Sequence, residues 1–237
     1  MGDRPFHFKH FSMMHQHSTM RIGTDAVLLG RWVTVHPDDR VLDVGTGCGI
    51  IAMMLAQRGA CHIDAVDLDA DSADGAALNF RVSQWRDRLS AYHADIKSFG
   101  ENATYDVIVS NPPYFVNSSK CDEDRRSMAR HSGMTLSFAD LLATANRLLR
   151  EKGRLSVVLP QREESNFMRE ASRFGFCLQH KLDIIPVEGL PYNRVNLEFV
   201  RERFKMDCVK ETFVIRHADG AFTDEYNTFL KDFYLGL

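Results

Sequence analysis

The sequence predicts an α/β protein whose open, doubly wound sheet is mostly parallel, with an antiparallel portion at its C-terminal edge. Strand patterns alternate with helix patterns along most of the 237 residues, as they do in βαβ units. Short apolar runs such as Tyr105–Ser110 are typical of strands that are buried on both faces. A glycine-rich loop directly follows the first such strand. At 44% hydrophobic residues, a chain of this length can form a core without disulfides or metals.

The N-terminal residues 1–39 are expected to form an extension with a lid helix. Residues 1–22 read as irregular, with four histidines among aromatic residues and methionines, namely His7, His10, His15 and His17. These histidines lack the spacing and the carboxylate partners of a metal site, so no metal is predicted. An apolar helical pattern begins at Thr24 and Asp25, either of which is a candidate N-cap.

Residues 40–237 are expected to form the catalytic core, which makes one domain with the extension. Strands are predicted at 40–44, 62–67, 89–94, 105–110 and 154–159, with helices at about 50–55, 69–85, 137–150 and 162–174. Two long strands at about 177–185 and 194–203, a strand near 208–216 and a helical tail at 223–237 complete the order. Only the last part of this order departs from regular strand–helix alternation.

Charge and cysteine usage restrict the class of protein. With 29 Lys and Arg against 32 Asp and Glu, the net charge of −3 excludes proteins that bind nucleic acid through massed positive charge. It leaves room for a local basic face. The five cysteines are odd in number and form no Cys-x-x-Cys pair, which favours reduced thiols and a cytoplasmic location. No apolar run reaches the roughly 18 residues of a membrane span, so no membrane partner is expected.

The loop Asp43–Gly49 predicts a cofactor site. It ends a strand and opens a helix, and glycine there lets a ligand approach the backbone. Asp67 closes the next strand about 20 residues later, the spacing at which a carboxylate can bind the hydroxyls of a ribose. These features together indicate a cofactor that contains adenosine. The alternative is a glycine-rich turn that binds nothing.

The spacing of the glycines in this loop distinguishes a dinucleotide from other cofactors that contain adenosine. Ile50 stands where the dinucleotide pattern G-x-G-x-x-G needs its third glycine, whereas D-x-G-x-G-x-G is present. The latter resembles motif I of class I S-adenosylmethionine-dependent methyltransferases, which have a Rossmann-like fold. The resemblance implies S-adenosylmethionine as cofactor, bound by Asp43, Gly45, Gly47, Gly49 and Asp67. Asp95 matches the family position whose carboxylate meets the adenine amino group, although an Asp after a strand is equally expected in a turn.

A second motif, Asn111-Pro112-Pro113-Tyr114, follows the strand at 105–110. Consecutive prolines remove two backbone donors and keep the preceding carbonyls out of a helix. The Asn111 side-chain oxygen and the Pro112 carbonyl can then accept the two N–H bonds of a planar amino group and turn its lone pair toward a methyl donor. Tyr114 offers a stacking face for a planar substrate. The alternative is an ordinary turn. With motif I, this tetrapeptide resembles amino methyltransferases that act on adenine or on glutamine side chains.

Further segments resemble the bacterial valine-tRNA adenine N(6)-methyltransferase family over nearly the whole chain. They are Phe6–Phe11, Met20–Gly30, Asp43–Gly49, Ile63–Asp67, Ser110–Tyr114, Ala129-Arg130, Val157–Pro160 and Phe233–Leu235. The resemblance implies methylation of the adenine beside the anticodon, with tRNA as the partner. It also implies that Thr24 and Asp25 lie by the cofactor, which competes with their interpretation as a helix N-cap.

The loop after the tetrapeptide contains basic residues that are candidates for holding RNA phosphates, namely Lys120, Arg125, Arg126 and Arg130. Nearby acidic residues dilute this charge, so a solvated loop is the alternative. Further basic candidates lie at Arg4, Lys9, Arg201, Arg203, Lys205 and Lys210. With no massed positive charge, RNA binding is expected to be modest and to weaken in salt.

The sequence alone leaves other functions open. A release-factor glutamine methylase lacks support because no separate N-terminal helical domain is visible. A DNA adenine methylase lacks a visible target-recognition domain. Asp67 would suit a nicotinamide oxidoreductase, but Ile50 argues against it. An RNA-binding module without activity is disfavoured by the intact Asn111 and Tyr114.

Overall fold

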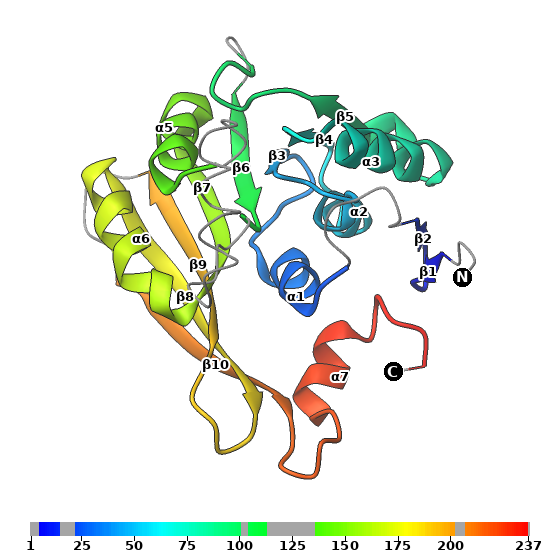
Figure 1. The fold of residues 1–237 in the computed structure, drawn as a ribbon, viewed down its shortest axis with the longest axis vertical. Helices are drawn as coiled ribbons and strands as arrows, with labels where there is room; N and C mark the ends of the chain where they lie inside the picture. The colour runs from blue at the N-terminus through cyan, green and yellow to red at the C-terminus, as the bar shows by residue number, and fades with distance from the viewer. Residues whose placement is uncertain (1–4, 15–21, 101–103, 113–135, 202–206, 237) are drawn as a thin grey trace, which may run out of the picture.

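The computed structural model describes residues 5–14, 22–100, 104–112, 136–201 and 207–236, and these form one large sheet between two layers of helices (Figure 1). The strands are β1 (Phe6–His7), β2 (Ser12–Met13), β3 (Arg40–Val44), β4 (His62–Asp67), β5 (Leu89–His93), β6 (Tyr105–Ser110), β7 (Leu149–Pro160), β8 (Phe176–Val187), β9 (Arg194–Arg201) and β10 (Val209–Arg216). The helices are α1 (Thr24–Trp32), α2 (Ile50–Gln57), α3 (Ala70–Val82), the 3₁₀ turn η1 (Arg86–Arg88), α5 (Phe138–Leu148), α6 (Gln161–Arg173) and α7 (Asp224–Leu230).

The eight strands of the large sheet follow the order β10-β8-β9-β7-β6-β3-β4-β5. The pairs from β5 to β7 are all parallel, and β9 runs antiparallel to both β7 and β8. The predicted α/β class and the antiparallel pairing in the C-terminal part are therefore confirmed. The outermost strand, β10, nevertheless pairs in parallel with β8, so β9 lies inside the sheet and not at its edge.

Each face of the sheet has its own hydrophobic core. One core joins α1, α2 and the N-terminal residues with the C-terminal tail, and the other joins α5 and α6 with the opposite face. In Figure 1, α5 and α6 lie on the left of the sheet, and α1, α2, α3 and α7 lie on the right. The central strands β3, β4 and β6 are almost fully buried, and all six residues of β6 are buried, which explains their mainly apolar sequences. The outer strands β5, β8 and β10 are only partly buried.

The N-terminal segment is not wholly irregular, which corrects the expectation for residues 1–22. The strands β1 and β2 form a short antiparallel hairpin, and its Phe8 pairs with Tyr234 of the C-terminal tail. The two rings stack with centroids 5.5 Å apart. Apolar contacts with the tail, which the local pattern does not reveal, thus order this segment. His15 and His17 lie outside the described residues.

The predicted tail helix at 223–237 is also shorter than expected, because α7 ends at Leu230 and the following backbone pairs with the hairpin. The backbone N–H of Lys9 donates to the carbonyl of Phe233 over 2.7 Å. A further difference concerns α1, whose N-cap is Gly23 without a side-chain hydrogen bond. The predicted N-cap role of Thr24 or Asp25 is therefore wrong.

Several other boundaries differ from the predictions by a few residues. The strand predicted at 154–159 extends from Leu149 to Pro160, and the helix predicted at 69–85 ends at Val82. A register shift of β7 against β6 and a positive φ of 59° at Lys152 show that the strand passes through an irregularity near Gly153. Among the described helices, none is long and apolar enough to cross a membrane.

Candidate active site

The predicted site residues come from four neighbouring parallel strands, β5, β4, β3 and β6. Parallel strands end at the same edge, which is where doubly wound sheets bind ligands. The chain therefore brings the glycine loop after β3, Asp67 at the end of β4, Asp95 after β5 and Asn111 after β6 to one edge of the sheet.

The glycine loop after β3 turns over the end of β4. The backbone N–H groups of Gly45 and Thr46 donate to the carbonyl of Val66 over 2.8 and 3.2 Å. Gly45, Gly47 and Gly49 all have positive φ, at 71°, 56° and 85°, a region that side chains disfavour. At Gly49 a Cβ atom would also lie only 2.6 Å from Cε1 of Phe80 in α3. Glycine at this position is required by the backbone and by the packing of α3.

Asp43 lies beneath this loop and is fully buried. Its Oδ2 accepts a 2.7 Å hydrogen bond from Thr46 Oγ1, whereas its Oδ1 has no hydrogen bond of normal geometry to the described residues. Burial raises the pKa of Asp43 to about 7, although the Thr46 hydroxyl and the backbone N–H of Ala52 act to lower it. A buried oxygen without a donor is costly, and a cationic group of a ligand would satisfy it. The ammonium of S-adenosylmethionine has that chemistry.

Asp67 joins the end of β4 to the glycine loop. Its Oδ2 accepts a 2.8 Å hydrogen bond from the backbone N–H of Gly47, and its Oδ1 accepts one of 3.0 Å from Asp69. Burial raises the pKa of the Asp67 carboxyl above its usual value, while these N–H donors oppose the shift. Each carboxylate oxygen can accept more than one hydrogen bond, so the group retains acceptor capacity for a ribose.

Asn111 follows β6 immediately and is partly exposed, and Pro112 next to it is buried. The hydroxyl of Ser110 donates a 2.8 Å hydrogen bond to the carbonyl of Val44, which fixes the end of β6 beside the end of β3. The start of the tetrapeptide is thereby held next to the glycine loop. Pro113 and Tyr114 lie outside the described residues.

The first turn of α1 is tied to the sheet by an ion pair. Nε of Arg194 lies 2.8 Å from Oδ2 of Asp25, and Arg194 opens β9 opposite Pro160, the last residue of β7. Since β9 is antiparallel, its first residue lies at the edge where β7 ends. Asp25 is therefore at the edge that carries the other predicted residues, while Thr24 beside it is exposed.

Asp95 lies in a turn after β5, where its Oδ1 accepts a 2.9 Å hydrogen bond from the backbone N–H of Lys97. The Lys97 ammonium is 3.3 Å from its other oxygen. These contacts fit the alternative of a turn residue. The backbone of Ala94 donates to the carbonyl of Asp67 over 3.0 Å, so the turn stays beside Asp67.

Sequence reasoning missed four residues of this edge. Thr46, Ser110 and Arg194 position the expected site residues, and Leu68 beside Asp67 exposes an apolar side chain. The sequence offers no local signal for Arg194 or Leu68, because the direction of β9 and the exposure of Leu68 are set by the folded structure. The expected RNA contacts Lys120, Arg125, Arg126 and Arg130 lie outside the described residues, as do Arg4, Arg203 and Lys205.

Other predicted features have plain structural roles in the described part of the chain. Arg201 donates to the carbonyl of Leu149 over 2.8 Å, and Nδ1 of His7 lies 2.8 Å from the hydroxyl of Ser12. No group of three potential metal ligands occurs among the described residues. The cysteines at 48, 61 and 208 are free thiols.

Comparison with known protein families gives a direct match. The methyltransferase small domain family matches residues 7–179. A protein of Trichodesmium erythraeum named tRNA1(Val) (adenine(37)-N6)-methyltransferase is 40% identical over 240 residues, covering 99% of each chain. Proteins with the same name from Phocaeicola vulgatus and Proteus mirabilis are 40% and 38% identical. They cover 98% and 97% of this chain, and 98% and 93% of their own lengths.

Solved structures support the fold. A predicted O-methyltransferase from Agrobacterium tumefaciens superposes with a TM-score of 0.69 at 16% identity, covering 88% of this chain and 96% of its own. A methyltransferase from Pyrococcus furiosus gives 0.58 at 21% identity, with coverages of 81% and 89%. A geranyl diphosphate methyltransferase in complex with SAM gives 0.54 at 18% identity, with coverages of 75% and 84%. At these identities the likeness concerns the fold alone.

Proposed function

The chain belongs to the methyltransferase small domain family and to the tRNA1(Val) (adenine(37)-N6)-methyltransferases within it, and we propose that it methylates the exocyclic amino group of adenine 37 in tRNA1(Val). S-adenosylmethionine supplies the methyl group on a sulfonium, which is a good leaving group. The tRNA is the macromolecular partner, and the reaction takes place in the cytoplasm. The observation that carries the proposal is the position of Asn111 beside the glycine loop, fixed by the hydrogen bond between Ser110 and Val44.

In the proposed cofactor site, the glycine loop of Gly45, Gly47 and Gly49 lets the cofactor approach the backbone closely. Asp67 accepts hydrogen bonds from the ribose, and Asp43 offers its unsatisfied Oδ1 to the methionine ammonium. A buried charged acceptor adds about 1.5–3 kcal/mol per hydrogen bond. The exposed side chain of Leu68 supplies apolar area beside the ribose for the adenine, and Asp95 accepts from the adenine amino group.

In the proposed mechanism, the protein promotes the reaction by orienting the adenine amino group toward the methyl donor. The side-chain oxygen of Asn111 and the carbonyl of Pro112 accept the two N–H bonds of the adenine amino group. The lone pair then points along the line of an in-line displacement. Tyr114 stacks on the base, Pro113 keeps the backbone rigid, and no strong general base is needed because the methylated ammonium loses its proton readily. Thr24 and Asp25 close the site from α1, with Arg194 holding Asp25 in place.

The basic residues Lys120, Arg125, Arg126 and Arg130 are proposed to hold tRNA phosphates next to this site. Residues 1–39 are proposed to act as an extension of a single catalytic domain. Packing of Phe8, Val27 and Leu28 in the same core as α2 supports that organisation.

The function is tested by incubating the protein with radiolabelled S-adenosylmethionine and purified tRNA1(Val). Label is expected in this tRNA and absent when position 37 is changed from adenine to guanine. DNA and a release factor serve as alternative acceptors. Label in either of them, with unlabelled tRNA, would contradict the proposed substrate while leaving the cofactor assignment intact.

A further inference from the structure

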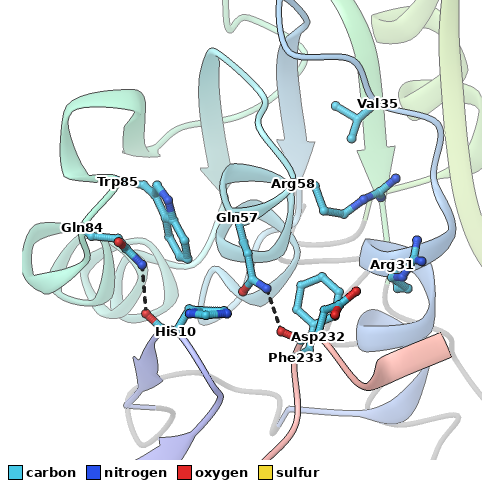
Figure 2. A pocket seen from close by; sticks show the side chains of 9 residues that line it. All are labelled: His10, Arg31, Val35, Gln57, Arg58, Gln84, Trp85, Asp232 and Phe233. Atoms are coloured by element: carbon cyan, nitrogen blue, oxygen red, sulfur yellow. Dashed lines mark hydrogen bonds between the residues drawn. The ribbon is translucent and has the colours of Figure 1, made fainter. Parts of the chain in front are cut away.

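A cavity of about 600 Å³ lies at the far end of α1 and α2 from the candidate active site. Figure 2 shows its lining, which comes from the ends of α1 and α2, the segment after α3, the N-terminal hairpin and the C-terminal tail. The lining residues are His10, Arg31, Val35, Gln57, Arg58, Gln84, Trp85, Asp232 and Phe233. Because α2 spans Ile50–Gln57 at about 1.5 Å per residue, about 12 Å separate this cavity from the glycine loop.

The wall formed by α1 and α2 is cationic. Arg58 donates from one terminal nitrogen to the carbonyl of Gly30 over 2.8 Å. Arg31 donates from Nε to the carbonyl of Phe229 over 3.0 Å, and its guanidinium lies 4.9 Å from the centroid of that ring. These contacts hold both guanidinium groups in place. Their other nitrogens have no hydrogen bond to the described residues, so each group retains donors for a ligand.

Among the described lining residues, Asp232 is the only carboxylate, so the lining in this part of the chain does not balance the charges of Arg31 and Arg58. Burial lowers the pKa of Arg58 to about 10, and the positive charge of Arg31 acts in the same direction, while Glu198 acts to raise it. Two cations that disfavour each other in a partly dehydrated wall are stabilised by a bound anion. A phosphate group has the charge and the acceptor oxygens that two guanidinium groups prefer.

The opposite side of the cavity offers a planar surface and an acceptor. Trp85 points its ring into the cavity (Figure 2), and its contact with Phe11 is edge-to-face at 5.8 Å. The side chain of Gln57 donates from Nε2 to the carbonyl of Asp232 over 2.8 Å, while its buried Oε1 has no partner among the described residues. A ring that stacks on Trp85 and donates an N–H to Gln57 would complete the lining.

We propose that this cavity binds a nucleotide, with its phosphate on Arg31 and Arg58 and its base against Trp85. The volume falls within the range of small-molecule sites, about 300–1,000 Å³. The site goes beyond the proposed methyl transfer, because none of its lining residues belongs to the candidate active site. The nucleotide can be a free metabolite or one residue of a bound RNA, and both have the same phosphate-and-base chemistry.

Fluorescence of Trp85 tests the proposal directly. The chain has two tryptophans, so the Trp32→Phe variant leaves Trp85 as the sole reporter. With S-adenosylhomocysteine saturating the cofactor site, uridine 5′-monophosphate is expected to quench this fluorescence in a saturable manner. Uridine should bind at least tenfold more weakly, and inorganic phosphate should compete with the nucleotide. Equal binding of uridine and its monophosphate, or no saturable quenching, would overturn the proposal.

Two variants and a control locate the site. Arg58→Ala removes one cation from the lining, but it also removes the contact of Arg58 with α1. His10→Glu leaves that contact intact and places a negative charge on an exposed residue at the rim of the cavity. Each is expected to weaken nucleotide binding at least tenfold. Arg86→Ala is the matched control, since Arg86 lies next to Trp85 in sequence but outside the lining, and is mostly exposed. Parental affinity in both variants would contradict the proposal.

Competition between tRNA and uridine 5′-monophosphate shows whether the cavity binds RNA or a free nucleotide. Displacement of uridine 5′-monophosphate by tRNA assigns the cavity to RNA, and full retention in the presence of tRNA assigns it to a free nucleotide; either result supports a nucleotide site. These binding measurements do not involve methyl transfer, so they succeed or fail independently of the proposed function.

Discussion

The backbone N–H of Gly47 donates a 2.8 Å hydrogen bond to Oδ2 of Asp67, so the residue expected to bind the ribose also holds the glycine loop. The proposed ligand contact and the observed loop contact therefore depend on one carboxylate. Substitution of Asp67 is expected to act on both.

Asp67→Ala is expected to weaken S-adenosylmethionine binding by at least tenfold, since a charged acceptor is worth about 1.5–3 kcal/mol. Isothermal titration calorimetry measures this loss. Asp87→Asn serves as the control because Asp87 is almost fully exposed and lies away from the loop. Unchanged affinity in Asp67→Ala, or equal thermal stabilisation of the parent by NAD, would contradict the cofactor site.

Asp43→Asn is expected to flatten the dependence of stability on pH. Between pH of about 4 and 7 the folded protein keeps a proton on Asp43, whose pKa is about 7, whereas the unfolded chain has released it. Stability from this group therefore falls as pH rises through that window, by at most about 4 kcal/mol. The Asn variant lacks this titration, so its melting temperature should exceed that of the parent at pH 8 and converge with it near pH 4.

Melting curves of the protein without cofactor, recorded from pH 4 to pH 8, measure the effect of Asp43→Asn. The same variant should bind S-adenosylmethionine more weakly, because the ammonium loses an anionic partner. Parallel melting-temperature profiles for variant and parent would show that Asp43 is ionised in the folded protein throughout this range.

Asn111→Ala is expected to bind S-adenosylmethionine with near-parental affinity and to lose turnover sharply, since one of the two acceptors for the amino group is removed. Asn111→Asp keeps an acceptor but adds a charge, and its activity should fall between those of the Ala variant and the parent. Single-turnover methylation of tRNA and calorimetry with the cofactor separate the two effects. Parental turnover in Asn111→Ala would contradict the proposed mechanism and show that the tetrapeptide serves only as a turn.

Gly49→Ala is expected to destabilise the fold by about 2–4 kcal/mol, the sum of a strained positive φ and a steric overlap with Phe80. Gly175→Ala is the control, because its φ is also positive at 81° but no atom lies within 4 Å of the added Cβ. The control should cost about 1 kcal/mol. Equal losses in chemical denaturation would show that α3 moves away from the added methyl group without cost.

Most strands of the core could be predicted because their apolar runs are continuous. The predicted bounds 40–44, 62–67 and 105–110 match β3, β4 and β6. The start of β7 could not be predicted, because Arg150–Gly153 is polar and reads as a turn. Its pairing with β6 through a register shift depends on tertiary contacts.

The common location of the candidate site residues at one edge of the sheet could be predicted where a motif is local, as for Asp43–Gly49 and Asn111. The residues that position them could not. Arg194 reaches Asp25 only because β9 runs against its neighbours, and a periodic apolar pattern does not encode strand direction. The N-cap prediction at Thr24 was wrong because Gly23 takes that position, and Asp25 bonds to Arg194 instead.

The pairing of Phe8 with Tyr234 has a consequence for synthesis on the ribosome. The hairpin buries Phe8, Phe11 and Met13, yet Tyr234, which pairs with it, is synthesised more than 200 residues later. During translation these three apolar side chains lack part of their native cover. Hydrophobic surface that is exposed during folding is prone to aggregation, so the nascent protein is expected to engage ribosome-associated chaperones until the segment around Tyr234 docks.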